Sequence, residues 1–243
     1  MCIAVFKPAG QKAPTFKTLK QCFKRNPDGA GFMVAINDKV VIRKGFMKYK
    51  DFEQAYKSFF VGLNDKDYSI VYHFRIGTQG GNVPELTHPY PLTRNYAEMR
   101  ELESECEMGV AHNGIIHLTS EYGVTDRNDS MTFISKYLVD IIHGNLFWST
   151  KPEKIRLINN LVGGGYPNRL AILTKTGYCT LIGNWIKDEG IYYSNSSYVI
   201  PEPVTRVRKC SSTRKIGVSS LFDSEEMTEE EFLQQCSAYG LLA

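Results

Sequence analysis

The stretch Ser69-Ile70-Val71-Tyr72 carries apolar side chains on both faces of a strand, and Ala171-Ile172-Leu173 repeats this pattern farther along the chain. A strand with one solvated face alternates apolar and polar residues, whereas a strand covered on both faces does not. Asn37-Asp38, between two such runs, is typical of a tight hairpin. The β-type runs cover residues 2–6, 31–36, 40–44, 68–75, 108–112, 170–174, 178–182 and 190–193. The sequence therefore predicts sheets that are buried on both sides.

Helical patterns separate these runs. Residues 130–143 and 153–162 each place their apolar side chains on one stripe, and both segments are followed by glycine, at Gly144 and Gly163. Weaker helical patterns cover residues 15–24 and 49–60. Clusters of strands separated by pairs of helices favour a layered α+β domain over a parallel doubly wound sheet.

Composition excludes several classes of protein. The 243 residues include 29 Lys+Arg and 26 Asp+Glu, and a net charge of +3 does not by itself indicate a nucleic-acid or membrane partner. No apolar run reaches the roughly 18 residues of a membrane span, and residues 1–8 are too short an apolar segment for a signal peptide. The six cysteines contain no C-x-x-C pair, which argues against a zinc site and a disulfide scaffold. We expect no metal and a reducing, cytoplasmic location.

The composition of the chain changes after Pro201. Residues 205–215 are polar and basic, residues 223–231 are acidic, and Thr228-x-x-Glu231 is a capping box that predicts a helix over residues 229–239. We therefore expect a core domain over residues 1–200 and a linker with a terminal helix over residues 201–243. The tail either packs as a solvated linker and docked helix or binds a partner.

Cys2 is the first candidate catalytic residue. Cells generally remove Met1 when the next residue is small, and the product carries a thiol and a free α-amine on one residue. The α-amine has a pKa of about 7.7–8.0 and the thiol about 8.5, so a general base and a nucleophile lie together. The alternative is a buried cysteine that begins an edge strand.

Three further motifs fit an amino-acid ligand, and each has a structural alternative. Arg75 ends a strand before a glycine-rich turn, where its planar fork suits a carboxylate, although it could instead pair with an internal acid. Asn113-Gly114 offers two converging donors for an oxyanion, but by default such a pair forms a hairpin turn. Asp129 could receive an ammonium group, or Asp129 or Ser130 could act as an N-cap. His112 and His117 are expected to be satisfied histidines rather than metal ligands.

Taken in order, these motifs resemble the glutaminase domain of class II glutamine amidotransferases, which are N-terminal-nucleophile hydrolases. Short stand-alone members look closer than the multidomain synthases. The matching stretches span roughly residues 2–200, and they are Met1-Cys2-Ile3, residues 26–31, His73-x-Arg75-x-Gly77-Thr78, Thr87-His88-Pro89, His112-Asn113-Gly114, Asn128-Asp129-Ser130 and Tyr193-Ser194-Asn195-Ser196.

The resemblance implies a role for each matching residue. Cys2 would attack the side-chain amide of glutamine, and Asn113 (side chain) and Gly114 (N–H) would hold the oxyanion. Arg75 would bind the substrate α-carboxylate, Asp129 the α-ammonium, and Thr78 would complete the pocket. The implied fold is a four-layer αββα sandwich of two mainly antiparallel sheets, and no cofactor is implied.

The substrate and the partner stay open at this stage. The released ammonia would serve a separate synthetase, or the protein would hydrolyse a γ-glutamyl amide directly. Ile3, Ile76 and Gln79 depart from residues common in the family, which puts substrate choice in question. A catalytically silent member that acts as a binding or regulatory module is the alternative. Nucleic-acid binding through residues 206–215 is not favoured, because five charges there lack interleaved aromatic residues.

Overall fold

The computed structural model describes residues 2–77, 81–120, 123–163 and 168–201. A boundary between two compact units falls after Pro201, so the predicted linker and terminal helix lie outside the described residues, as do Thr78 and Gln79. The strands are β1 (Ile3–Lys7), β2 (Ala30–Ile36), β3 (Lys39–Phe46), β4 (Ser69–Phe74), β5 (Tyr90–Pro91), β6 (Glu103–Cys106), β7 (Met108–Asn113), β8 (Arg169–Thr174), β9 (Cys179–Ile182), β10 (Ile186–Asp188) and β11 (Ile191–Tyr193). The α-helices are α1 (Phe16–Arg25), α2 (Tyr49–Phe59), α3 (Tyr96–Arg100), α4 (Asp129–Phe133), α5 (Val139–Ile142) and α6 (Pro152–Leu161).

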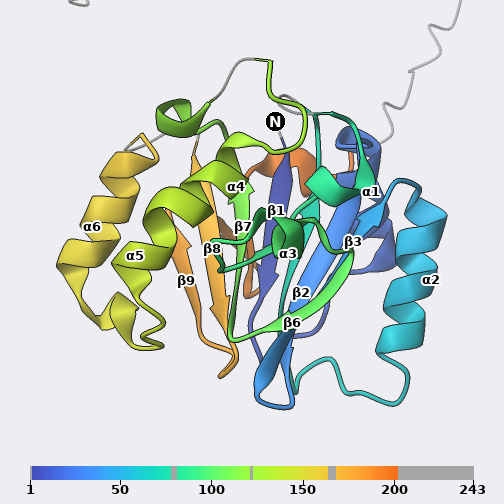
Figure 1. Cartoon of the computed structure of the whole chain (residues 1–243). Coiled ribbons are helices and arrows are strands. Elements are labelled where there is room, and N and C mark those ends of the chain that lie inside the picture. Colours follow the sequence, from blue (N-terminus) through green and yellow to red (C-terminus); the bar gives the residue numbers. More distant parts are fainter. Residues whose placement is uncertain (1, 78–80, 121–122, 164–167, 202–243) are drawn as a thin grey trace, which may run out of the picture. The chain divides into compact units, whose positions relative to one another are not determined.

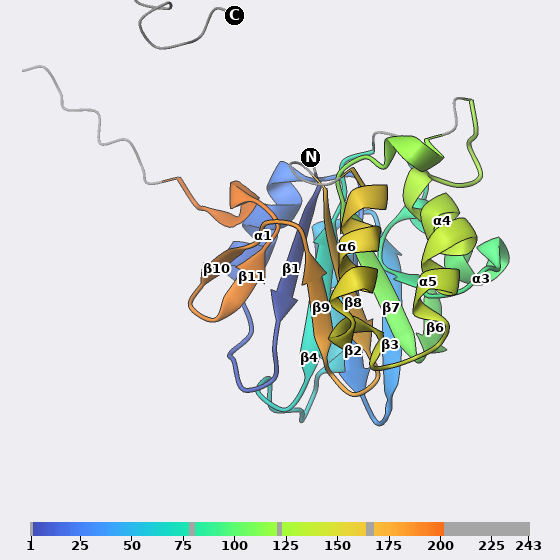
Figure 2. The same cartoon turned by 90° about the vertical axis from the view of Figure 1, so that its left-hand side faces the viewer.

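The strands form two antiparallel sheets, which confirms that part of the predicted fold class. Within the described ranges, one sheet has seven strands in the order β10-β11-β1-β4-β2-β3-β6, and the other has four in the order β5-β7-β8-β9. The mixed α/β chain has helices on the outer side of each sheet (Figures 1 and 2). No helix in the described part of the chain combines the length and the apolar character needed to cross a bilayer.

Clusters of buried apolar side chains hold these elements together. Phe32 and Tyr72 of the seven-stranded sheet pack against Leu19 and Phe52 of helices α1 and α2. A separate cluster joins β7 and β8 to the segment from α4 to α6. Between the two sheets lies a third cluster, formed by Phe6, Met33, Ala35, Val40, Ile42, Val71, Ala111, Ala171 and Leu173. Every residue of β1, β4, β7 and β8 is buried, as the doubly apolar runs predict.

The hairpin prediction at Asn37-Asp38 is confirmed. Asn37 and Asp38 have φ values of 53° and 57° and join β2 to β3, with Ile36 opposite Lys39. Positive φ at both central residues is the geometry of a type I′ turn, whose twist matches that of the flanking strands. The register of the seven-stranded sheet is therefore fixed locally at this end.

The helix expected over residues 130–143 begins one residue earlier. Asn128 is the N-cap, because its side chain accepts a hydrogen bond from Met131 N–H (3.0 Å), so the proposed cap at Asp129 or Ser130 is wrong. A π-helical turn, Ile134–Leu138, joins α4 to α5, and His143 ends the helix in the left-handed conformation.

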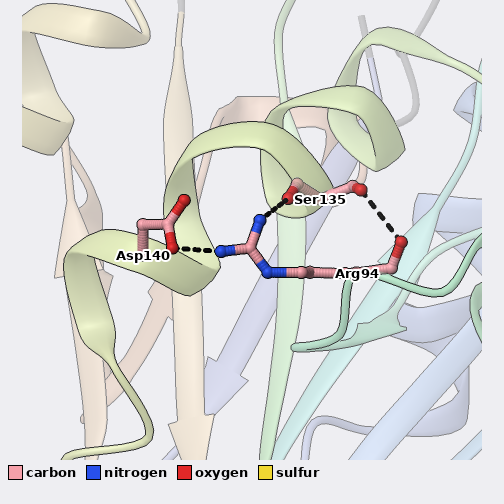
Figure 3. Close-up of polar contacts among 3 residues, drawn as sticks. All are labelled: Arg94, Ser135 and Asp140. Carbon is pink, nitrogen blue, oxygen red and sulfur yellow. Dashed lines mark hydrogen bonds and ion pairs between the residues drawn. The ribbon is translucent and has the colours of Figure 1, made fainter.

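Arg94 fastens this helix to the segment that follows β5. Its guanidinium donates to the Ser135 carbonyl (3.4 Å) and forms an ion pair with Asp140, while the Ser135 hydroxyl donates to the Arg94 carbonyl (2.9 Å) (Figure 3). Each segment therefore donates a hydrogen bond to a backbone carbonyl of the other. The π-helical turn and α5 are consequently fixed to the segment that follows β5.

Candidate active site

Cys2 and Arg75 leave the seven-stranded sheet side by side. Strand β1 begins at Ile3, which lies opposite Phe74 at the end of β4. The backbone of Ile76 brackets the Cys2 thiol: its N–H donates to Sγ (3.3 Å), and Sγ donates to its carbonyl (3.4 Å). The Asn195 side chain donates to the Cys2 carbonyl (2.6 Å). The thiol is thus anchored at the end of the sheet where β1 begins.

The environment of Cys2 keeps its thiol protonated near neutral pH. Burial raises the pKa of Cys2, and the hydrogen bond from Ile76 and the positive charge of Arg75 lower it in part. Because the thiolate is the nucleophilic form, this thiol needs a nearby base to become reactive.

Arg75 is buried, with 3% of its surface exposed. Its guanidinium donates to Asn82 Oδ1 (3.0 Å) and to the Gly81 carbonyl (3.2 Å). Asp28 supports the same turn, because its carboxylate accepts from Gly77 N–H (2.9 Å). The segment around Asp28 thus supports the loop that carries Arg75.

Asn113 and Gly114 do not form a hairpin turn, so that interpretation is wrong. Asn113 is the last residue of β7, whose neighbours are β5 and β8, and the chain continues through Ile116 toward α4. Gly114 has a φ of +141°, and a Cβ there would lie 2.0 Å from Asn168 Oδ1. Only glycine fits this position without displacing Asn168.

The Asn113 side chain is fully buried beside β11. Its Nδ2 donates to Ser194 Oγ (2.8 Å), and Ser194 Oγ also accepts from Ala4 N–H (2.8 Å). Asn113 Oδ1 has no hydrogen-bond partner among the described residues. The side-chain amide is therefore held at one end only.

Asp129 lies in the first turn of α4. Its Oδ2 accepts from Ile116 N–H (2.7 Å) and its Oδ1 from Ser130 N–H (2.9 Å). A carboxylate has about four lone-pair positions, so these bonds leave capacity for a ligand. The carboxylate is buried and its orientation is fixed by backbone donors.

His112 is satisfied, as the sequence predicts. Its Nε2 faces Asn168 Oδ1 (3.0 Å), which can only accept, so Nε2 carries the proton. Burial lowers the pKa of His112 and keeps the ring neutral, so Nδ1 accepts from the Ser130 hydroxyl (2.8 Å). No group of three or more His, Cys, Asp or Glu side chains in the described ranges is arranged to hold a metal ion.

Several of the sequence-predicted residues line one pocket. Its walls are formed by Cys2, Arg75, Ile76, His88, His112, Gly114, Asn128, Asp129 and Ser130. The volume enclosed is about 20 Å³, room for about one water-sized group, so a larger ligand would require the walls to move apart. Asn113 is buried next to Gly114 rather than in this wall, and Thr78 lies outside the described residues.

A larger pocket of about 430 Å³ lies at the opposite ends of the strands, near Asn37, Ser69 and Gly177. Its wall includes Lys175, which forms an ion pair with Glu107 (2.8 Å). It contains neither a cysteine nor a histidine. The smaller pocket is the better candidate, because a thiol, a guanidinium and a carboxylate line it together.

Sequence reasoning did not select His88 or Ser194 as site residues. Both residues lie in stretches that carry the family resemblance, but the resemblance implied no role for them. Ser194, which directly follows β11, contacts Asn113 across 81 positions of the chain. Apart from their place in these stretches, no sequence signal distinguishes them from ordinary buried polar side chains.

Comparisons with known proteins do not assign the chain to a family: no protein-family model matches it, and no curated protein has a matching sequence.

Proposed function

We propose that this chain is a glutaminase-type amidohydrolase that resembles class II glutamine amidotransferases and uses Cys2 as its nucleophile. The observation that carries the proposal is the single pocket lined by the Cys2 thiol, the Arg75 guanidinium, Gly114 and the Asp129 carboxylate. These groups come from two sheets and a helix, and together they offer what an amino acid with a side-chain amide requires. With helices outside two facing antiparallel sheets, the fold is proposed to be the four-layer αββα sandwich of N-terminal-nucleophile hydrolases.

The proposed reaction begins with removal of Met1, which frees the α-amine of Cys2. This amine accepts the thiol proton, and the sulfur forms a bond to the amide carbon of the substrate. The C–N bond of the tetrahedral intermediate then breaks, the nitrogen takes the proton from the α-ammonium group, and ammonia leaves. Water attacks the remaining thioester and releases glutamate and the thiol. The raised pKa of Cys2 supports a need for this built-in base.

The charged groups of the pocket suit the two ends of an amino acid. Arg75 would bind the α-carboxylate, for which its planar guanidinium is suited. Asp129 would bind the α-ammonium through the lone pairs that Ile116 and Ser130 leave unused. Thr78 is proposed to contribute to the same pocket.

The oxyanion would be held by Gly114 N–H and the Asn113 side chain. The Nδ2 of Asn113 carries two N–H donors, and Ser194 Oγ accepts a hydrogen bond from one of them. In the reverse amide orientation, the Ser194 hydroxyl would donate to Oδ1, and both Nδ2 donors would be released. That orientation pairs the oxygen that otherwise has no described partner, and we propose it for the substrate complex.

The decisive experiment combines intact mass with covalent labelling. The purified chain is treated with a diazoketone analogue of glutamine, and the modified residue is mapped by peptide mass spectrometry. We expect loss of Met1, one adduct on Cys2, and protection of Cys2 by excess glutamine. Cys106→Ala is the matched control, because Cys106 is also partly buried and free, and it should label like the wild type.

Retention of Met1 with no adduct on Cys2 would contradict the enzymatic proposal and favour the silent binding module. If Cys2 is labelled but glutamine is not hydrolysed, the substrate is a larger γ-glutamyl amide. Ammonia release measured with γ-glutamyl amides distinguishes those substrates, and the ammonia is proposed to serve a separate enzyme where glutamine itself is hydrolysed.

A further inference from the structure

His88 is a buried histidine that the proposed reaction does not use. It lines the same pocket as Cys2, and only 5% of its surface is exposed. Neither of its ring nitrogens has a hydrogen-bond partner among the described residues. A buried polar group without a partner is energetically unfavourable, so a ligand that pairs with it gains binding energy.

The other side chains of the pocket already have partners for their polar atoms or have an assigned role. Asn128 accepts from Met131 N–H (3.0 Å) and donates to the Tyr90 hydroxyl (2.7 Å). His112 and Ser130 are joined to each other, and the second ring nitrogen of His112 faces Asn168. Among the described side chains that line the pocket, His88 is therefore the one whose polar atoms are all unused.

His88 is a neutral ring throughout the physiological pH range. Burial lowers its pKa well below the ordinary value, and the nearby His73, His112, Lys44 and Arg75 lower it further. A neutral imidazole has one N–H donor and one lone-pair acceptor. It can hold an N–H group of a ligand, but it does not supply a proton to one.

The ring of His73 packs beside that of His88 without a hydrogen bond between them. The two ring centroids lie 4.4 Å apart, and His73 Nε2 donates to the His112 carbonyl (3.0 Å). His73 Nδ1 is consequently an acceptor, and it too lacks a partner among the described residues. Either neutral tautomer of His88 leaves one ring nitrogen with an unused lone pair.

We propose that His88 accepts a hydrogen bond from the leaving amide nitrogen of the substrate. This inference rests on the proposed function, in which Gly114, Arg75 and Asp129 bind the carbonyl oxygen, the carboxylate and the ammonium. The substrate NH₂ group then needs an acceptor, and His88 is the pocket side chain that has one unused. His88 is thus a substrate-contacting residue that favours amides over groups without N–H.

The test compares two substrates that differ in this N–H group. Glutamine and the γ-methyl ester of glutamate share every other contact, but the ester leaving group has no N–H donor. For His88→Leu we expect kcat/KM for glutamine to fall roughly 10- to 100-fold, because one hydrogen bond to a buried group is lost. We expect kcat/KM for the ester to fall less than about threefold, because the ester does not make this bond. His88→Gln, whose Oε1 can accept, should recover most of the glutamine activity.

Equal losses for glutamine and the ester would overturn this inference while leaving the proposed function intact. If the wild type hydrolyses neither substrate and Cys2 is not labelled, the proposed function fails first, and the inference fails with it. A second measurement needs no change at His88: ¹⁵N NMR of Cys2→Ala should show the His88 ring nitrogens shifting when glutamine binds. No shift in a complex that is saturated with glutamine would also overturn it.

Discussion

Ser194→Ala should destabilise the fold by about 2–6 kcal/mol, because Ser194 Oγ is a shared acceptor at the junction of three strands. It accepts from Ala4 N–H in β1 and from Asn113 Nδ2 at the end of β7, both at 2.8 Å, and Ser194 follows β11 with 0% of its surface exposed. Removing the hydroxyl leaves two buried donors unpaired, and each such loss costs about 1–3 kcal/mol. A second Ser194 bond, from its own N–H to the Ala4 carbonyl (2.9 Å), is retained in the variant.

Equilibrium unfolding in urea measures this change as a shift in the midpoint at constant slope. Ser196→Ala is the matched control, because Ser196 is exposed two positions away, and it should change the free energy of unfolding by less than about 0.5 kcal/mol. An equally small change for Ser194→Ala would refute the argument that Ser194 joins β1 to Asn113. Because Asn113 loses its anchor, the variant should also lower kcat for glutamine without preventing labelling of Cys2.

Four other variants test separate parts of the structure. Cys2→Ala should abolish glutamine hydrolysis with unchanged circular dichroism, and Asn113→Ala should lower kcat by about a hundredfold or more, measured by ammonia release. Arg94→Ala should cost no more than about 1 kcal/mol in urea unfolding, because its ion pair with Asp140 is solvent-exposed; a larger cost would show that the Ser135 contact dominates. Burial lowers the pKa of His73 to about 3, so between about pH 6.5 and 3 the unfolded chain binds a proton that the folded chain does not. Stability should therefore fall as pH falls, by about 1.4 kcal/mol per pH unit from this group, and His73→Gln should show a correspondingly weaker pH dependence in urea unfolding.

The strands that the sequence predicts well are those with local signals. Apolar runs bounded by turn residues locate β1, β2, β4, β7 and β8 to within one or two residues, since burial on both faces demands apolar side chains throughout. Strands β6 and β10 were not predicted. Their residues are largely exposed, and they are held by backbone pairing with β3 and β11 rather than by an apolar pattern.

The candidate site shows the same division between local and distant information. Asn128, Asp129 and Ser130 are all good capping residues, and local sequence does not decide among them. Asn128 caps the helix because both oxygens of Asp129 are turned to backbone donors, one of them in the segment before α4. Likewise, the surroundings of His88 include His73 of β4 and His112 of β7, and local sequence around His88 does not predict these contacts.

The site is built where independent packing interfaces meet, so it depends on the register of both sheets. The pairing of Ile3 with Phe74 places Cys2 beside Arg75, and the pairing of Asn113 with Arg169 places Gly114 against Asn168. A slip of one residue in either pair would turn the side chains to the opposite face of the sheet. Such a slip would also expose the apolar residues that pack between the sheets, so the hydrophobic core that stabilises the fold also maintains the alignment of the pocket.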